Sequence, residues 1–507
     1  MTDIALDPRV RSFIVGVLAL VLSWFVGSEI GAGEYILPVG LMVMVIVVSI
    51  AAMLTRTIRL EALILGLLLF GYIVGQLGFA HASPLRRGGI FFGEIGMALC
   101  VTTFAMRAAI MRQRFVPRDP LAWLVLAFVG VGTLRFAFDF YSSHDRLTVL
   151  HDFATVYYAV FFFLAADIAR DTRSRRFIAK VLTIALITVF GMYTIYSINP
   201  RLFFHVMIAG YPLVYPRSDL TGSFMGFACV LFYFKRLDSN RPGVWLALSI
   251  AAFAVIILSL SRATFVGFAV IAVLLVVARR PGLLGYLGAA ACCAWLVFAV
   301  IAASRTHTGE ETFITRVTDK ALSIVDFSGK ENYSSTTGEA SAGNNRFRQS
   351  WWKAVRDETL EKNPIFGLGF GYNLTARFIR TYDEPLDEDF MGRSPHSILY
   401  TVLGRMGLVG LFTFAALVCA ILWRAFKSAV RSRTDFRRLD ELAYWCGIVT
   451  ILITSCFGVM LEGPMAAIVF WSLLGIVVQR ELLRRDSAVT SRQERAKSIG
   501  EVELMPA

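Results

Sequence analysis

The sequence has little charge for its length, and this scarcity excludes an ordinary soluble protein. Only 17% of its 507 residues are charged, whereas 56% are hydrophobic and the mean hydropathy is +0.63. Apolar runs of about 17 to 25 residues, the length that crosses a ~30 Å hydrocarbon core as a helix, recur along nearly the whole chain. We therefore expect an all-α polytopic membrane protein, in which every backbone group is hydrogen-bonded within its helix.

Cysteine is also scarce, and its placement excludes a disulfide framework and a zinc site. All seven cysteines lie in apolar runs, and no two have the C-x-x-C spacing. They are Cys100, Cys229, Cys292, Cys293, Cys419, Cys446 and Cys456. We expect them to be small core residues, and we expect no metal site.

The apolar runs predict about fourteen transmembrane helices, eleven before one long polar segment and three after it. They lie near 12–26, 35–54, 60–80, 89–106, 120–136, 149–168, 177–198, 218–234, 243–260, 262–278, 283–303, 396–423, 441–461 and 463–479. With the N-terminus in the cytoplasm, every inward connection is basic, as the positive-inside rule requires. Both termini are then cytoplasmic. The net charge of +13 is explained by this topology and by anionic lipids and substrates, without a nucleic acid.

The long polar segment divides the chain into four regions. Residues 1–303 form the first transmembrane region, 304–395 an outward-facing loop and 396–479 a second transmembrane region. Residues 480–507 form a cytoplasmic tail that we expect to be disordered or associated with the lipid surface.

Within the loop, residues 346–362 have apolar residues at helical spacing, which predicts an amphipathic helix on the outer membrane surface. We expect a flexible stretch before it, from Gly338 to Asn345, and a solvated acidic cluster after it, from Asp383 to Asp389.

Two residues at the outward boundary could carry chemistry. Arg262 follows Ser259-Leu260-Ser261 at a hairpin between apolar runs, so it is either a structural anchor or an anion clamp, since a guanidinium matches phosphate oxygens. His396 begins the helix that leaves the polar segment, where histidine can serve as a general base near neutral pH.

Other charged residues have a structural and a functional interpretation. Arg346, Arg348 and Arg356 are either a solvated basic face or groups that close over the same anion as Arg262. Glu94 and Asp167 stand in or near apolar runs, so we expect neighbouring helices to satisfy them.

The order of these motifs resembles the O-antigen ligase and polymerase superfamily of bacterial membrane proteins. The segment RFRQSWWKAVRDETLEKNPIFGLGFGYN, followed after a gap by PHSILYTVLGRMGLVGL, carries the resemblance together with the Ser-x-Ser-Arg hairpin. The matching positions are Ser259, Ser261, Arg262, Arg348, Trp352, Pro364, Gly367, Gly369, Gly371, His396, Gly407 and Gly410. Two positions depart from the pattern: Ser397 replaces the usual Asn, and Arg405 stands where Glu is common.

The resemblance implies glycosyl transfer in the bacterial inner membrane from an undecaprenyl-pyrophosphate-linked oligosaccharide to an acceptor hydroxyl. It implies an inverting reaction on the outer side, without a metal, a cofactor or a nucleotide sugar. His396, Arg262 and Arg348 would be catalytic, and Arg346, Arg356, Trp352 and Gly369 would bind substrate.

Three functions remain open at this point. The chain could polymerise exopolysaccharide or O-antigen repeats, which we favour, or it could be a ligase that moves the finished chain onto lipid A core. In another class, it could be a flippase or exporter of the lipid-linked oligosaccharide. The implied partners are the donor, a glycan or lipid A core acceptor, and membrane lipids. Chain-length regulators and export proteins are further candidates.

Overall fold

The computed structural model describes most of the chain. It covers 58–81, 91–111, 116–205, 207–208, 211–212, 214–304, 335–382 and 392–503, with seven further positions between 315 and 333. The helices expected near 12–26 and 35–54 and the acidic cluster from Asp383 to Asp389 lie outside these residues.

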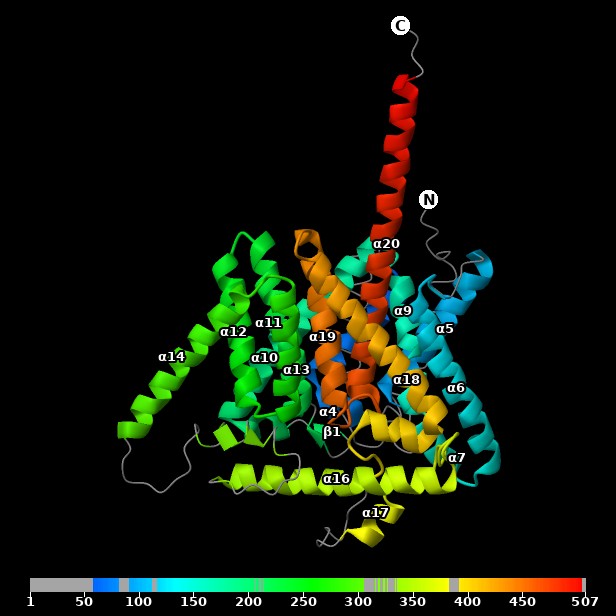
Figure 1. Ribbon diagram of the computed structural model, residues 1–507, viewed down its shortest axis with the longest axis vertical. Coiled ribbons are helices and arrows are strands. Elements are labelled where there is room, and N and C mark those ends of the chain that lie inside the picture. The colour runs from blue at the N-terminus through cyan, green and yellow to red at the C-terminus, as the bar shows by residue number, and fades with distance from the viewer. Residues whose placement is uncertain are drawn as a thin grey trace.

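The described residues fold almost entirely into helices (Figure 1). The first half contains α3 (Leu60–Val74), α4 (Gln76–His81), α5 (Phe92–Met111), α6 (Pro120–Ser142), α7 (Arg146–Asp152), α8 (Ala154–Tyr157), α9 (Val160–Ile168), α10 (Thr172–Ile198), η1 (Pro200–His205), α11 (Ser218–Lys235) and η2 (Arg236–Asp238). The second half contains α12 (Pro242–Leu258), α13 (Arg262–Val277), α14 (Gly282–Ser304), α16 (Thr336–Lys362), α17 (Ala376–Thr381), α18 (Ile398–Arg431), η3 (Phe436–Arg438), α19 (Leu439–Ser455) and α20 (Pro464–Glu503). Two strands of two residues each, β1 (Met207–Ile208) and β2 (Tyr211–Pro212), pair antiparallel.

Each apolar run expected within the described residues coincides with a helix or a broken series of helices. In the part of the chain that the structure describes, four helices are long and apolar enough to cross a membrane: α6, α10, α18 and the Pro464–Ser487 part of α20. The bent series from α7 to α9 makes a fifth if it counts as one span. The apolar helices α3, α12, α13 and the first part of α14 are shorter. The total of fourteen spans stays a prediction.

Side chains at the helix ends explain several boundaries. Asp119 accepts a hydrogen bond from the backbone N–H of Leu121, and Pro120 opens α6, so this start combines an N-cap with a proline in the first turn. Ser261 caps α13 in the same way through the N–H of Thr264. The Ser-x-Ser-Arg hairpin is therefore a helix start that fixes the position of Arg262.

Two ends of the bundle are clearly different (Figure 1). Helix α16 lies across one end, roughly perpendicular to the bundle, whereas α20 extends from the opposite end. The connections that contain the basic clusters, α11–α12, α13–α14 and α18–α19, lie at the α20 end. We call the two ends the α16 end and the α20 end.

Three expectations differ from the structure. Helix α16 begins at Thr336, so the stretch from Gly338 to Asn345 is helical, because Arg262 and Asp326 hold Asn345 in place. Helix α20 continues to Glu503, where we expected a disordered tail. The cysteines are all free, but Cys292, Cys293 and Cys419 are exposed on helix surfaces instead of lying in the core, because their apolar runs face outwards.

Candidate functional site

His396 lies at the junction between the polar segment and the bundle. It directly precedes α18 and has a left-handed backbone (φ 54°), a conformation that costs energy outside glycine and often marks a functional position. Its ring packs edge-on against Trp351 with centroids 5.7 Å apart. Burial, followed by the charges of Arg348 and Arg217, lowers the pKa of His396 to about 4. The imidazole is therefore neutral at neutral pH.

Arg348 reaches from α16 towards the connection between α19 and α20. Its Nη1 donates a hydrogen bond of 2.6 Å to the carbonyl oxygen of Phe457. Burial, followed by the like charge of Arg262, lowers the pKa of Arg348 to about 10, so it stays charged at neutral pH. This guanidinium is held by a carbonyl oxygen, which leaves its positive charge available to an anion.

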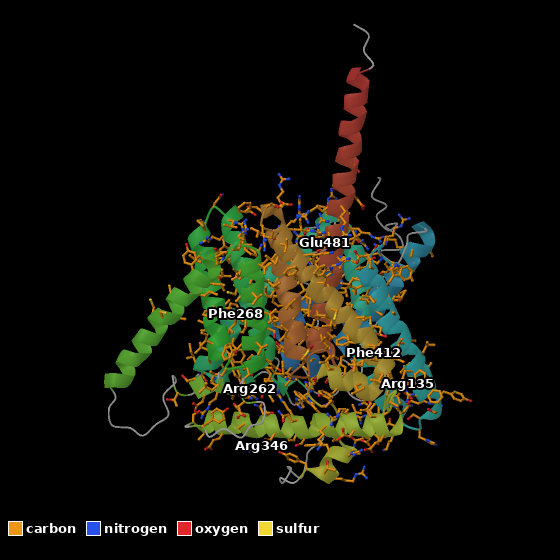
Figure 2. All side chains as sticks on the ribbon, in the orientation of Figure 1. Arg135, Arg262, Phe268, Arg346, Phe412 and Glu481 are labelled. Atoms are coloured by element: carbon orange, nitrogen blue, oxygen red, sulfur yellow. The ribbon has the colours of Figure 1, made fainter. Side chains whose placement is uncertain are left out.

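Arg262 lies at the start of α13 and faces the side of α16 that is turned towards the bundle (Figure 2). Its Nη1 donates to the Oδ1 of Asn345 at 2.6 Å and to the carbonyl oxygens of Ser341 at 3.2 Å and Ser323 at 3.4 Å. Arg262 thus joins the hairpin to the beginning of α16, so it has a structural role as well as a place in the candidate site.

Arg217 and Asp219 belong to the same cluster, although sequence reasoning missed them. Arg217 lies just before α11 and pairs with Asp219 through two hydrogen bonds, from Nε at 3.1 Å and from Nη2 at 2.6 Å. The fields of both residues act on His396 and Arg348. The available signal was an Arg-x-Asp pair at the beginning of an apolar run, which resembles an ordinary helix start.

Trp352 and Glu462 hold the turn that carries His396. The Nε1 of Trp352 donates to the carbonyl oxygen of Pro395 at 2.6 Å, and its ring stacks on Tyr400 at 5.2 Å. The carboxylate of Glu462 accepts a hydrogen bond from Ser394 and another of 2.6 Å from Thr401. Burial raises the pKa of Glu462 even though these bonds oppose the shift. The turn is therefore fixed on both sides of His396.

The glycine-rich turn is packed against the bundle at a distance from this cluster along the chain. Gly367 and Gly407 have positive φ angles of 74° and 63°, and a Cβ at either position would clash with the backbone of the other. Backbone hydrogen bonds join the turn to α18, from Leu368 N to Gly404 O at 2.7 Å and from Leu408 N to Pro364 O at 2.8 Å.

Gly369, expected to bind substrate, lies against the Arg135–Asp139 ion pair of α6, where a side chain would not fit. This contact explains the glycine by packing.

Arg405, one of the two departures from the family pattern, holds the glycine-rich turn. Its side chain is only 3% exposed, and its Nη2 lies 2.9 Å from the Oδ2 of Asp152. Its Nη1 donates to the carbonyl oxygens of Gly369, at 3.1 Å, and Tyr372. Arg405 therefore joins α18 to the glycine-rich turn and to Asp152 of α7. Ser397, the other departure, is buried at the N-cap of α18 without a capping hydrogen bond.

Two of the expected substrate-binding arginines do not join the cluster. Arg356 is exposed and pairs with its neighbour Asp357 at 2.8 Å. Arg346 is exposed on α16 (Figure 2). Of the seven site residues that the sequence predicted, the structure brings His396, Arg348, Arg262 and Trp352 together through shared contacts and fields.

Within the described residues there is no group of three or more His, Cys, Asp or Glu side chains placed to hold a metal ion. The cluster instead combines three guanidinium groups, a neutral imidazole and aromatic rings. Such a set can bind an anion and accept a proton.

No curated protein matches the chain. Residues 246–415, which contain Arg262, Arg348, His396 and the glycine-rich turn, match the family model described as O-antigen ligase. This match confirms the resemblance found in the sequence: residues 246–415 are similar to the O-antigen ligase domain of the ligase and polymerase superfamily. Together with the apolar helices, it points to a multi-pass bacterial membrane protein.

Proposed function

We propose that this protein transfers a glycan from an undecaprenyl-pyrophosphate-linked oligosaccharide to an acceptor hydroxyl, and that it polymerises exopolysaccharide or O-antigen repeats. Its family implies polymerase- or ligase-type glycosyl transfer in polysaccharide biosynthesis. The observation that carries the proposal is the neutral His396 beside the charged Arg348, at the end of the bundle that α16 covers.

The proposed reaction is a single displacement at the anomeric carbon. The acceptor oxygen attacks this carbon, its bond to the pyrophosphate oxygen breaks, and the lipid pyrophosphate leaves with the electron pair. His396 accepts the proton of the attacking hydroxyl. Arg348 and Arg262 stabilise the negative charge that develops on the leaving group, and the anomeric configuration is inverted.

The location of the cluster supports a lipid-linked donor. The pyrophosphate of such a donor lies at the membrane surface, and the cluster stands at the α16 ends of helices α11 and α13 and of α18, a helix long and apolar enough to cross a membrane. Outside the cytoplasm nucleotide sugars are essentially absent, so a transferase on the outer side needs a donor of this kind.

The first experiment compares the wild type with His396→Ala in lipid nanodiscs that contain only lipid-linked oligosaccharide repeats. We expect a ladder of longer lipid-linked chains from the wild type and a rate at least 10²–10⁴-fold lower from the variant, the range of general-base assistance. His144→Ala is the matched control, because His144 is an exposed histidine in the connection between α6 and α7. Normal activity of a folded His396→Ala protein would rule out the base.

The same assay separates the other functions. Transfer only after lipid A core is added would make the protein a ligase. Movement of labelled donor across the bilayer, without any transfer, would make it a flippase.

A further inference from the structure

Arg217 is the cation of the cluster that neither the motifs nor the matched family segment contains. It lies before α11, outside residues 246–415. Its partner Asp219 nevertheless lies beside Arg348: a Cβ on Gly458 would be 3.2 Å from the Oδ2 of Asp219, and the neighbouring Phe457 accepts the hydrogen bond of Arg348. In accord with this, the charge of Arg217 lowers the pKa of both His396 and Arg348. The question is whether the Arg217–Asp219 pair only begins a helix or also binds substrate.

The backbone at Arg217 is fixed by a side chain from a distant helix. Its N–H donates a hydrogen bond of 2.8 Å to the Oε1 of Gln76, and the Nε2 of Gln76 donates to the Oγ1 of Thr221 at 2.8 Å. Gln76 is fully buried and has a left-handed backbone (φ 48°) at the break between α3 and α4. Gln76, a buried residue with a strained backbone, thus holds the start of α11. A helix start with no further role does not need such a contact.

The guanidinium of Arg217 is oriented by Asp219, which engages only part of its N–H donors. The carboxylate of Asp219 accepts hydrogen bonds from Nε and Nη2, and Nη1 donates none to a residue in the described part of the chain. A quarter of the side chain remains exposed. By contrast, Nη1 of Arg262 already has three acceptors in the polar segment. In the described structure Arg217 therefore keeps its Nη1 for a ligand, whereas the Nη1 of Arg262 is committed to the polar segment.

We propose that Arg217, oriented by Asp219 and Gln76, is a further pyrophosphate-binding arginine of this site and acts together with Arg348. This inference rests on the proposed function. A pyrophosphate has two phosphoryl groups, and two guanidinium forks can engage one each. Arg348 approaches from α16 and Arg217 from the bundle, so the donor's head group binds between the membrane part and the polar segment.

This arrangement links donor binding to the basicity of His396. The positive charges of Arg348 and Arg217 lower the pKa of His396 in the free protein. A bound pyrophosphate offsets both charges, so the imidazole becomes a stronger base once the donor is present. Proton acceptance is thereby favoured in the donor complex over the free protein.

The test measures binding of short lipid probes to the full chain in nanodiscs. The probes are farnesyl pyrophosphate, farnesyl monophosphate and farnesol, and the variants are Arg217→Ala and Arg217→Lys. We expect the wild type to prefer the pyrophosphate, Arg217→Ala to bind it at least about tenfold more weakly, and Arg217→Lys to fall between them. Arg201→Ala is the matched control, because Arg201 is an exposed arginine in the same α10–α11 connection.

Two further measurements distinguish a role of Arg217 in ligand binding from a role in holding the fold. Hydrogen exchange of residues 339–350 should be unchanged in Arg217→Ala and faster in Arg262→Ala, since only Arg262 contacts this part of α16. In addition, the acid limb of the kcat/KM profile, which reports His396 in the free protein, should move to higher pH in Arg217→Ala.

The outcomes distinguish the two proposals. A wild type that binds the pyrophosphate no better than farnesol would contradict the proposed function itself. A wild type that prefers the pyrophosphate, with equal affinity in a folded Arg217→Ala protein, would overturn the role of Arg217 alone. An unmoved acid limb would overturn its electrostatic link to His396.

Discussion

Two arginines of the candidate site and three arginines of the α20 end are held in opposite ways. At the α20 end their partners are carboxylates. Arg59 and Arg107 both pair with the buried Asp167, and Arg424 donates two hydrogen bonds to the fully buried Asp119. At the α16 end, Arg348 and Arg262 donate instead to carbonyl and amide oxygens.

This difference indicates which charges are available to a ligand. A buried guanidinium that is matched by a carboxylate is already satisfied, and its net effect is to fix helices relative to one another. A buried guanidinium that is bonded to neutral oxygens keeps its full charge, and an incoming anion can still gain from it. Pairing therefore separates Arg348 and Arg262 from these arginines of the α20 end, whereas Arg217 is intermediate, since Asp219 engages its Nε and Nη2 and leaves Nη1 for a ligand.

Arg405 provides the strongest test of this comparison, because it lies at the α16 end and yet has a carboxylate partner. Arg405→Glu, which introduces the residue common in the family, would place its carboxylate beside Asp152 and the carbonyl oxygens of the glycine-rich turn. We expect loss of folded protein or of all activity, measured by thermal unfolding and by the transfer assay. The double variant Arg405→Glu with Asp152→Arg restores the opposite charges and should recover part of the stability. No recovery would show that the pairing itself is unimportant.

Arg348→Ala should produce the next largest effect, and on catalysis alone. Removal of a group that stabilises the leaving-group charge costs about 10²–10³-fold in turnover. The melting temperature should change little, since the arginine gives one hydrogen bond to a carbonyl oxygen. Arg356→Ala is the control from the same helix, because Arg356 is exposed and pairs only with a neighbouring residue in the described structure. Equal turnover in the two variants would contradict the assignment.

Asp167→Asn should affect stability and spare transfer. The change leaves Glu61 as the remaining carboxylate partner of Arg59 and Arg107 in the described structure, and breaking a buried pair costs about 3–5 kcal/mol. Thermal unfolding should report the loss, while the rate per folded molecule stays near that of the wild type. A large fall in this rate would mean that the α20 end contributes to the reaction.

The smallest expected effect is that of mild acid on transfer. Because the pKa of His396 is lowered to about 4, the base stays neutral down to that pH, and the rate falls only below it. The contribution of this pKa shift to the free energy of unfolding also decreases as the pH falls. The unfolded histidine binds its proton near pH 6.5, so this contribution is fully present above pH 6.5 and is lost as the pH falls towards 4. An acid limb of kcat/KM near pH 6.5 would show that His396 is not in this environment.

Much of the fold could be predicted from the sequence, because hydrophobic length alone determines where membrane helices lie. The apolar runs from 60 onwards coincide with helices, and Glu94 is satisfied by Tyr157, Tyr158 and the N–H of Phe91 as expected. The positions at which an apolar run breaks into separate helices were less predictable. The run at 149–168 became three helices with a bend of 43°, since tertiary packing decides where such a helix bends.

The site was only partly predictable for a similar reason. Motifs identified His396, Arg348 and Arg262, which come together at one end. They did not identify Arg217, because its role depends on Gln76, 141 positions earlier in the chain. The motifs also assigned Gly369 to substrate, which stays a prediction, and they gave no sign of its close packing against α6. Contacts between distant segments have no local signature.

The attachment of the candidate site to late segments of the chain has a consequence for biosynthesis. Arg348 depends on Phe457, and the turn at His396 depends on Glu462, both beyond α19. During synthesis these residues leave the ribosome after helices α3 to α19, so a nascent chain lacks a complete site until the segment between α19 and α20 has been made. Incomplete chains would thus reach the membrane without the ability to act on the lipid-linked sugars around them.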